Sequence, residues 1–259
     1  MTLAKLQDLS GRVALVTGGS RGLGLQMAEV LGELGARVAI SARKPAELAE
    51  AKAHLTALGI ECLTVPCDMG DLAAIPALID SVIGGLGPID ILVNNAGTTW
   101  GQPTAEHTLE GWNKVLTLNL TAIFVATQEV GKRCMLPRNS GKVVNIASIQ
   151  GLSGGYPEGM PTIAYNASKG GLVNFTRMLA KEWAPHHINV NAIAPGYFES
   201  KMTRHIFDHQ HDKTAGLAPL GRTGGVEDLK GITALLATEA GAFITGQTIA
   251  VDGGLTAVF

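Results

Sequence analysis

A tyrosine and a lysine stand four residues apart in the string YNASK, at Tyr165 and Lys169. On a helix this spacing places the phenol and the ammonium on the same side, about one turn apart. A free phenol has a pKa of about 10 and is a poor base at neutral pH, but a nearby cation favours the phenolate. The pair therefore predicts acid–base chemistry in which Tyr165 gives a proton in one direction of a reaction and takes it in the other.

Two further polar residues are candidates to assist this tyrosine. Ser148 ends the strand-like run KVVNIAS, where its hydroxyl would hold a substrate oxygen; a helix-capping serine is the alternative. Asn119 falls inside a long helical pattern, in which asparagine is a mediocre helix former. We expect a local kink there that holds a proton-relay water, and an ordinary polar surface residue is the alternative.

The glycine-rich string TGGSRGLG, residues 17–24, follows the first apolar run and opens a helical pattern. This context is typical of a dinucleotide-binding turn, because the free N–H groups and the positive dipole end of a helix N-terminus attract a pyrophosphate. A purely structural turn is the alternative. The predicted roles are a tight turn at Gly18, close backbone approach at Gly22 and close helix packing at Gly24. The predicted cofactor contacts of the turn are Gly18, Ser20, Arg21, Gly22, Leu23 and Gly24.

The end of the second apolar run bears on the choice of cofactor. An NAD-specific site places an acidic residue there for the ribose 2′-hydroxyl, but the chain reads Ser41-Ala42-Arg43-Lys44, with no carboxylate in reach. Arg43 and Arg21 would instead clamp a 2′-phosphate, assisted by the hydroxyl of Ser41. The sequence thus predicts NADP(H) as cofactor, with Lys44 at the same end of the site. The alternative is that Arg43 and Lys44 only begin a solvated helix.

Two later strand ends complete the predicted cofactor site. Asp68 follows the third apolar run and is placed to accept from the adenine amino group, with Met69 offering its backbone amide. Asp68 is equally suited to cap the next helix, and both roles are compatible. Asn95, Ala96 and Gly97 follow the fourth run, at the sheet edge where open α/β sheets bind ligands. Their small side chains suit close packing beneath a cofactor.

The elements that must position these residues alternate regularly. Short runs rich in Val and Ile alternate with helical patterns near residues 22–35, 45–58, 71–85, 107–133, 163–183 and 226–237. This rhythm predicts an α/β fold, a Rossmann-type doubly wound parallel sheet of about seven strands with helices on both faces. No linker divides the chain, so residues 1–259 are expected to form a single domain, with a substrate lid at residues 197–224.

Composition excludes several other classes of protein. A net charge of −2 with 16% charged residues gives no signal for nucleic acid or an anionic membrane, so a small-molecule ligand is expected. The three cysteines form no disulfide framework, and no apolar stretch approaches about 18 residues, which favours a cytoplasmic protein. The lid histidines His205, His209 and His211 lack Cys or acidic partners at tight ligand spacing, so no metal site is expected.

Taken together, the motifs TGGSRGLG, NNAG, YNASK, IAPG and VDGG resemble the short-chain dehydrogenase/reductase superfamily over essentially the whole chain. The resemblance implies a catalytic tetrad formed by Asn119, Ser148, Tyr165 and Lys169. It also implies that Lys169 bonds the nicotinamide ribose. Members of the family commonly form tetramers, so the resemblance implies a homo-tetramer, or a dimer, built on the regions near residues 107–133 and 163–183 and on the C-terminal tail.

Further positions follow from the same resemblance. Pro195 and Gly196 match a cofactor-side turn, and Phe198 and Ser200 would lie near the nicotinamide amide, with Ser200 standing where threonine is usual. The strings SARK, DILVNNAGTTWG and APGYFESKMTRHI are similar to β-ketoacyl reductases of rhamnolipid biosynthesis and related acyl-carrier-protein reductases. Residues 148 and 165 lie 17 positions apart, a few more than is usual in the family, so the loop 151–161 is expected to reshape the substrate pocket.

The sequence therefore predicts an NADP(H)-dependent oxidoreductase that reduces a carbonyl to a secondary alcohol, with a 3-oxoacyl thioester as the substrate implied by the narrower likeness. One alternative is an NAD(P)-dependent dehydrogenase acting on an alcohol, a polyol or a steroid-like substrate. The other is a cofactor-binding regulator without turnover. Such a regulator has no need of Tyr165 and Lys169, whose presence favours chemistry.

Overall fold

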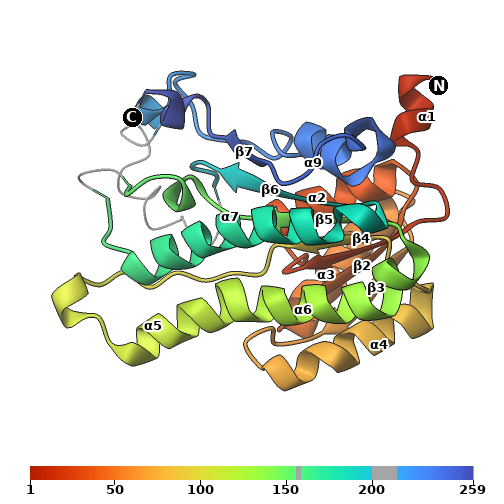
Figure 1. Ribbon diagram of the computed structural model, residues 1–259, viewed down its shortest axis with the longest axis horizontal. Coiled ribbons are helices and arrows are strands. Elements are labelled where there is room, and N and C mark those ends of the chain that lie inside the picture. Colours follow the sequence, from red (N-terminus) through yellow and green to blue (C-terminus); the bar gives the residue numbers. More distant parts are fainter. Residues whose placement is uncertain (156–158, 200–214, 259) are drawn as a thin grey trace.

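The computed structural model describes residues 1–155, 159–199 and 215–258. Seven strands, all paired in parallel, form one sheet in the order β3-β2-β1-β4-β5-β6-β7 (Figure 1). The strands are β1 (Val13–Thr17), β2 (Arg37–Ala42), β3 (Cys62–Pro66), β4 (Ile91–Asn94), β5 (Gly141–Ile146), β6 (Ile188–Pro195) and β7 (Thr248–Val251). The direction of winding reverses between β1 and β4, and this confirms the predicted doubly wound fold.

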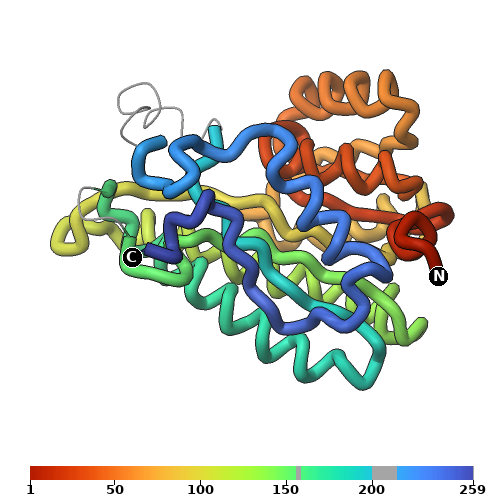
Figure 2. Tube along the Cα trace, turned by 90° about the horizontal axis from the view of Figure 1, so that it is seen from above, coloured from red at the N-terminus to blue at the C-terminus, as the bar shows by residue number. Residues whose placement is uncertain are grey.

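Helices cover both faces of this sheet, as Figure 1 shows. They are α1 (Leu3–Gln7), α2 (Gly22–Glu33), α3 (Pro45–Ala57), α4 (Ile75–Leu86), α5 (Leu109–Leu116), α6 (Ala122–Val130), α7 (Ile163–Trp183) and α9 (Lys230–Ala237). Across the described residues, none of the helices has both the length and the apolar character needed to span a bilayer. The N-terminus and the last described residues, near position 258, lie at opposite ends of the molecule, the latter at the end toward which β6 and β7 point (Figure 1 and Figure 2).

Two apolar cores lie on the two faces of the sheet. Along β1, the side chains of Ala14 and Val16 enter the core formed with α2, α3 and α9, while Val13 and Leu15 enter the core formed with α4, α6 and α7. Successive side chains of a strand point to opposite faces, so a strand covered on both sides must be apolar throughout. This requirement explains why the sequence shows continuous Val- and Ile-rich runs.

The helical segment predicted over residues 107–133 is present, but it is not a regular α-helix throughout. It contains α5, a π-helical turn at Thr117–Thr121, α6 and a second π-helical turn at Gly131–Met135. A π turn takes up one extra residue within a helix, and such turns occur frequently at functional sites. The irregularity expected at Asn119 is therefore a π turn, and the proton-relay water expected there stays a prediction.

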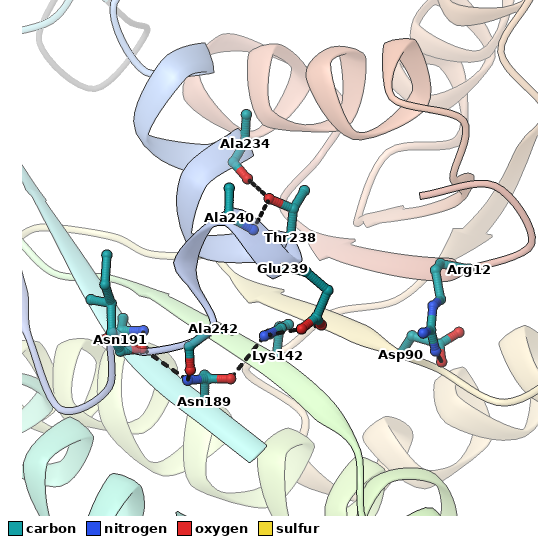
Figure 3. A network of polar contacts seen from close by, with 11 residues as sticks. Arg12, Asp90, Lys142, Asn189, Asn191, Ala234, Thr238, Glu239, Ala240 and Ala242 are labelled. Atoms are coloured by element: carbon teal, nitrogen blue, oxygen red, sulfur yellow. Dashed lines mark hydrogen bonds and ion pairs between the residues drawn. The ribbon is translucent and has the colours of Figure 1, made fainter. Parts of the chain in front are cut away.

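Polar contacts tie the amino ends of the strands together, at the edge opposite to the carboxyl ends (Figure 3). Asp90 accepts a hydrogen bond from Arg12 at 3.1 Å and from the first backbone N–H of β1 at 2.9 Å. Lys142 donates to Asn189 at 2.8 Å and lies 3.3 Å from a carboxylate oxygen of Glu239. Burial lowers the pKa of Lys142, and Glu239 opposes that change. These contacts hold the strand starts in register and leave the carboxyl ends for a site.

Candidate active site

A cavity of about 790 Å³ lies at the carboxyl ends of the strands. Its wall includes Ser148, Tyr165 and Lys169, and it also includes the cations Arg21, Arg43 and Lys44. The other predicted residues in its wall are Gly18, Ser20, Gly22, Leu23, Gly24, Ser41, Asp68, Met69, Asn95, Ala96, Gly97, Pro195, Gly196 and Phe198. The structure thus brings together nearly all the residues proposed from sequence, although they come from six of the seven strand ends.

Tyr165 and Lys169 lie one turn apart on α7, as their spacing predicts. The ammonium of Lys169 lies 5.6 Å from the centroid of the Tyr165 ring and donates to the carbonyl oxygen of Ile146, at the end of β5, at 2.6 Å. Lys169 is only 4% exposed, whereas the Tyr165 ring is half-buried against the cavity. The hydrogen bond to the end of β5 and the burial therefore fix the lysine beside the tyrosine ring, unlike a flexible lysine on the surface.

The pKa values of this pair differ from the sequence expectation. Burial raises the pKa of the Tyr165 phenol, and its hydrogen bond with Ser148 opposes that change in part. Burial also lowers the pKa of Lys169 to about 8. The expected lowering of the phenol pKa by the neighbouring cation is therefore wrong for these surroundings, because removal of water from both groups disfavours the phenolate and the ammonium alike.

Ser148 is placed by the short helix that follows it. Its side chain accepts from the N–H of Gln150 at 3.2 Å and so caps the 3₁₀ helix Ile149–Gly151, which confirms the capping role considered from sequence. The same hydroxyl bonds Tyr165. A Cβ on Gly151 would lie 2.7 Å from the backbone carbon of Lys169, so glycine lets this helix pack directly against α7. Capping and contact with Tyr165 are both present at Ser148.

Asn119 does not line the cavity but lies fully buried behind it, inside the π turn. Its side-chain oxygen accepts from the N–H of Thr98 at 2.8 Å, and its amide nitrogen donates to the Thr98 carbonyl at 2.9 Å and to Ser168 on α7 at 3.1 Å. An exposed polar residue, the alternative drawn from sequence, is therefore wrong. The asparagine joins the loop after β4 to the helix that carries Tyr165 and Lys169.

The glycine-rich turn is held to the end of β4 by Thr17 and Asn95. The Thr17 hydroxyl accepts from the N–H of Asn95 at 3.0 Å, and the Asn95 amide donates to the carbonyls of Thr17 and Gly18 at 2.9 and 3.0 Å. Gly18 has φ +65°, and a Cβ on Gly24 would lie 2.3 Å from the Gly18 carbonyl oxygen. The tight turn and the close helix packing expected of these glycines are present. Asn95 thus supports the turn as well as lining the cavity.

A carboxylate lies beside two of the cations in the cavity wall, although the string of residues 41–44 contains none. Arg21 donates to Glu47 at 2.6 Å, and the ammonium of Lys44 lies 3.4 Å from the same oxygen. Glu47 belongs to the first turn of α3, and Lys44 is the N-cap residue of that helix. The expectation that no carboxylate is in reach is therefore wrong, because the helix after β2 turns back toward the glycine-rich turn. Arg43 lines the cavity and is exposed to solvent.

Two buried polar side chains in the cavity wall have no hydrogen-bond partner among the described residues. They are the hydroxyl of Ser41, which is fully buried, and the side-chain oxygen of Gln26, whose residue is 7% exposed. Buried polar atoms are normally hydrogen-bonded, so both mark places where a polar ligand would be favourable. Ser41 was expected from sequence, whereas Gln26 was missed because its position on α2 carries no visible motif.

Asp68 bonds its own turn and does not cap the next helix. Its side chain accepts from the N–H of Gly70 at 2.9 Å, and it is Asp71 that caps the short helix before α4, through the N–H of Ala73. Asp68 is exposed and lines the cavity, with Met69 buried beside it. The capping alternative for Asp68 is therefore wrong, and its predicted contact with adenine stays a prediction.

Beneath the site, a chain of buried amides and hydroxyls joins strands to helices and was missed from sequence. Asn94 donates to Asn145 at 2.9 Å and to Thr127 at 3.0 Å, and Asn145 donates to Thr176 on α7 at 3.0 Å. These contacts lock β4, β5, α6 and α7 together directly below the residues that line the cavity. The polar residues inside the runs IDILVNN and KVVNIAS were the available signal.

The predicted lid is described only at its two ends. Phe198 forms an isolated parallel bridge with Gly224 and is 4% exposed, so the two ends of the segment meet beside the cavity. Ser200 and the lid histidines lie outside the described residues. In the part of the chain that is described, no three His, Cys, Asp or Glu side chains are grouped so as to hold a metal ion.

Comparison with known proteins agrees with this geometry. The family model described as short chain dehydrogenase matches residues 12–211. The rhamnolipids biosynthesis 3-oxoacyl-[acyl-carrier-protein] reductase of Pseudomonas aeruginosa is 42% identical, over 95% of this chain and 97% of the relative. Gluconate 5-dehydrogenase of Gluconobacter oxydans is 37% identical over 99% of both chains. The crystal structure of a gluconate 5-dehydrogenase from Burkholderia cenocepacia, in complex with NADP and tartrate, matches with a TM-score of 0.91 and 34% identity over 99% of both chains. The chain therefore belongs to the short-chain dehydrogenase family of oxidoreductases.

Proposed function

We propose that this protein is an NADP(H)-dependent oxidoreductase that reduces a ketone to a secondary alcohol. The observation that carries the proposal is the arrangement of a single cavity. Tyr165, hydrogen-bonded to Ser148 and fixed above Lys169, lines the same cavity as Arg21 and Arg43. One cavity of the size of a ligand thus contains both a proton donor and cations that can bind a phosphate.

The residues present fit a dinucleotide with a 2′-phosphate. The glycine-rich turn leads into the N-terminus of α2, where N–H groups and the helix dipole favour a pyrophosphate. Arg21, Arg43 and Lys44 supply cations at the same cavity, and the unpartnered hydroxyl of Ser41 would gain a hydrogen-bond partner. NADP bound to the Burkholderia relative supports the same assignment.

NADPH, held by the glycine-rich turn and the cations of the cavity, would supply the hydride that adds to the carbonyl carbon. Ser148 and Tyr165 hold the carbonyl oxygen by hydrogen bonds, and the Tyr165 hydroxyl transfers its proton to that oxygen. The raised pKa of Tyr165 keeps the phenol protonated at neutral pH, as reduction requires. Lys169, charged at pH 7 because its pKa is about 8, stabilises the phenolate that remains and would hold the nicotinamide ribose.

Asn119 is proposed to assist the reaction through its place in the π turn, and its side chain is not proposed to contact the substrate. Both N–H groups of its side chain are engaged by Thr98 and Ser168, so the side chain itself is not available to donate to a relay water. The main chain of the π turn, whose hydrogen bonding departs from that of an α-helix, is the better candidate to hold such a water and return a proton to Tyr165 through Lys169.

For the substrate, we propose a 3-oxoacyl thioester, which is supported by the Pseudomonas relative at 42% identity. A keto-sugar acid is the second candidate, because a gluconate 5-dehydrogenase matches 99% of the chain. The test is NADPH oxidation at about 340 nm with 3-oxoacyl thioesters, 5-ketogluconate, cyclic diketones and steroids, with NADH in parallel. Turnover of one class establishes the reaction. NADPH binding without turnover of any class would favour the regulator alternative.

We further propose that the protein is cytoplasmic and forms a homo-tetramer, or a dimer. The supporting observation is that apolar side chains are exposed on the helices that flank the site, at Phe124 on α6 (48%) and Met178 on α7 (56%). The free, buried cysteines suit a reducing compartment. Light scattering coupled to size exclusion tests the assembly, and Phe124→Glu is expected to reduce the measured mass. A monomeric mass for the unmodified protein would contradict this proposal.

A further inference from the structure

One carboxylate joins two of the cations at the NADP(H) end of the cavity. The same oxygen of Glu47 lies 2.6 Å from the guanidinium of Arg21 and 3.4 Å from the ammonium of Lys44. Arg21 comes from the glycine-rich turn and Lys44 from the residue before α3, so the carboxylate bridges two segments that are far apart in sequence. All three residues line the cavity.

The bridge is set in place by the start of α3. Lys44 is the N-cap residue of that helix and Pro45 its first residue, which puts Glu47 in the first turn, where a carboxylate is also favoured by the helix dipole. The Glu47 side chain is 24% exposed, while those of Arg21 and Lys44 are 48% and 62% exposed. The carboxylate is therefore the least exposed of the three groups, and both cations contact it.

We propose that Glu47 is a specificity-determining residue that sets the preference between NADP(H) and NAD(H). The inference rests on the proposed function, because it assumes that Arg21 and Lys44 meet the 2′-phosphate. A 2′-phosphate must draw both cations away from Glu47 and must tolerate a negative charge beside it. A ribose 2′-hydroxyl leaves both ion pairs intact and can donate to the carboxylate, as an acidic residue does in NAD sites.

The net effect follows from comparing the two cofactors. Glu47 pairs with Arg21 when no phosphate is present, so binding of NADPH exchanges one anion for another and gains less than it would from a free cation. Repulsion between the carboxylate and the phosphate acts in the same direction, and the partial exposure of the group limits it. NADH meets neither penalty. Glu47 thus reduces the ratio of the affinity for NADP(H) to that for NAD(H). Without it, the three cations Arg21, Arg43 and Lys44 would make this ratio larger.

The test measures cofactor affinity by calorimetry, without substrate, for the unmodified protein, Glu47→Gln and a matched control. Glu47→Gln is expected to lower the Kd of NADPH by about fivefold and to leave the Kd of NADH within about twofold. Adenosine 2′,5′-bisphosphate should follow NADPH and adenosine 5′-monophosphate should follow NADH, because each pair shares the presence or absence of the 2′-phosphate. The control is Glu50→Gln, the same substitution at an exposed position of α3, and it should change neither affinity.

The outcomes separate the two proposals. If the unmodified protein fails to bind NADPH, the proposed function falls, and this inference with it. If the unmodified protein binds NADPH but Glu47→Gln leaves its Kd unchanged or raises it, only the inference is overturned, and Glu47 serves instead to orient Arg21. Equal tightening of NADPH and NADH also overturns it. A thermal melt of each variant confirms that the compared proteins are folded.

Discussion

Lys169 lies under the ring of Tyr165, 5.6 Å from its centroid, and is held there by the carbonyl oxygen of Ile146. The same desolvation acts on both side chains with opposite sign, raising the pKa of the phenol and lowering that of the ammonium to about 8. At neutral pH both groups therefore carry their protons. The pair is set for donation of a proton, which is the state that carbonyl reduction needs.

Replacement of Tyr165 by phenylalanine tests this assignment. Tyr165→Phe removes the proton donor while keeping the ring, so kcat for reduction should fall by about 10³-fold. The Kd of NADPH should stay within about twofold, since the glycine-rich turn and the cations are untouched. Steady-state kinetics and calorimetry measure the two quantities. Activity retained by Tyr165→Phe would remove Tyr165 from the mechanism.

The buried ammonium of Lys169 should also appear in the pH dependence of stability. A lysine whose pKa is lower in the folded than in the unfolded state makes folding more favourable as the pH rises through the folded pKa, because the unfolded chain then binds more protons. Between pH 7 and about 9.5, the unfolding free energy of the unmodified protein should rise relative to that of Lys169→Met by about 2 kcal/mol.

Chemical denaturation across that pH range provides the measurement. Lys181→Met, at an exposed position of the same helix, is the control and should follow the unmodified protein throughout. Parallel curves for the unmodified protein and Lys169→Met would mean that Lys169 is not desolvated.

Arg43 provides a test of the phosphate-binding end. Arg43→Asp places a negative charge where the 2′-phosphate is proposed, so the Kd of NADPH should rise by about tenfold or more and that of NADH by less than about threefold. Calorimetric titration with both cofactors distinguishes the two effects. Lys52→Asp, the same charge change at an exposed position farther along α3, serves as control. An equal loss of both affinities would argue against a phosphate contact at Arg43.

Gly151 should control the position of Ser148. A Cβ at this residue would lie 2.7 Å from the backbone of Lys169, so Gly151→Ala must push the short helix away from α7. We expect kcat to fall by about tenfold and the stability by about 1–3 kcal/mol, as for overpacked sites. Gly84→Ala, at an exposed position of α4 away from the cavity, is the matched control, because a Cβ there meets no atom within 4 Å. Kinetics and thermal melts that are alike for the two variants would contradict this role.

Much of the fold was predictable because both sheet faces are covered, which leaves continuous apolar runs at the strands and amphipathic patterns between them. The catalytic residues Tyr165 and Lys169 could also be predicted from the sequence, because their spacing of four residues matches one turn of a helix. Glu47 could not, because its ion pairs join two segments whose approach depends on how α2 and α3 pack, and Gln26 could not, because its position on α2 carries no motif. The raised pKa of Tyr165 could not be predicted either. The spacing of the residues indicates a neighbouring charge, but it does not indicate that the phenol is removed from water.

The bridge between Phe198 and Gly224 has a consequence for how such an enzyme could diversify. The returning chain is paired with the departing chain at this bridge and is also tied to the turn after β7, because the N–H of Leu220 donates to the carbonyl oxygen of Gly253 at 3.0 Å. Replacing residues 198–224 by the matching residues of a relative with another substrate would therefore change contacts with the frame as well as the substrate side. We expect such a chimaera to alter both selectivity and melting temperature, while Tyr165, which lies outside the exchanged residues, keeps its chemistry.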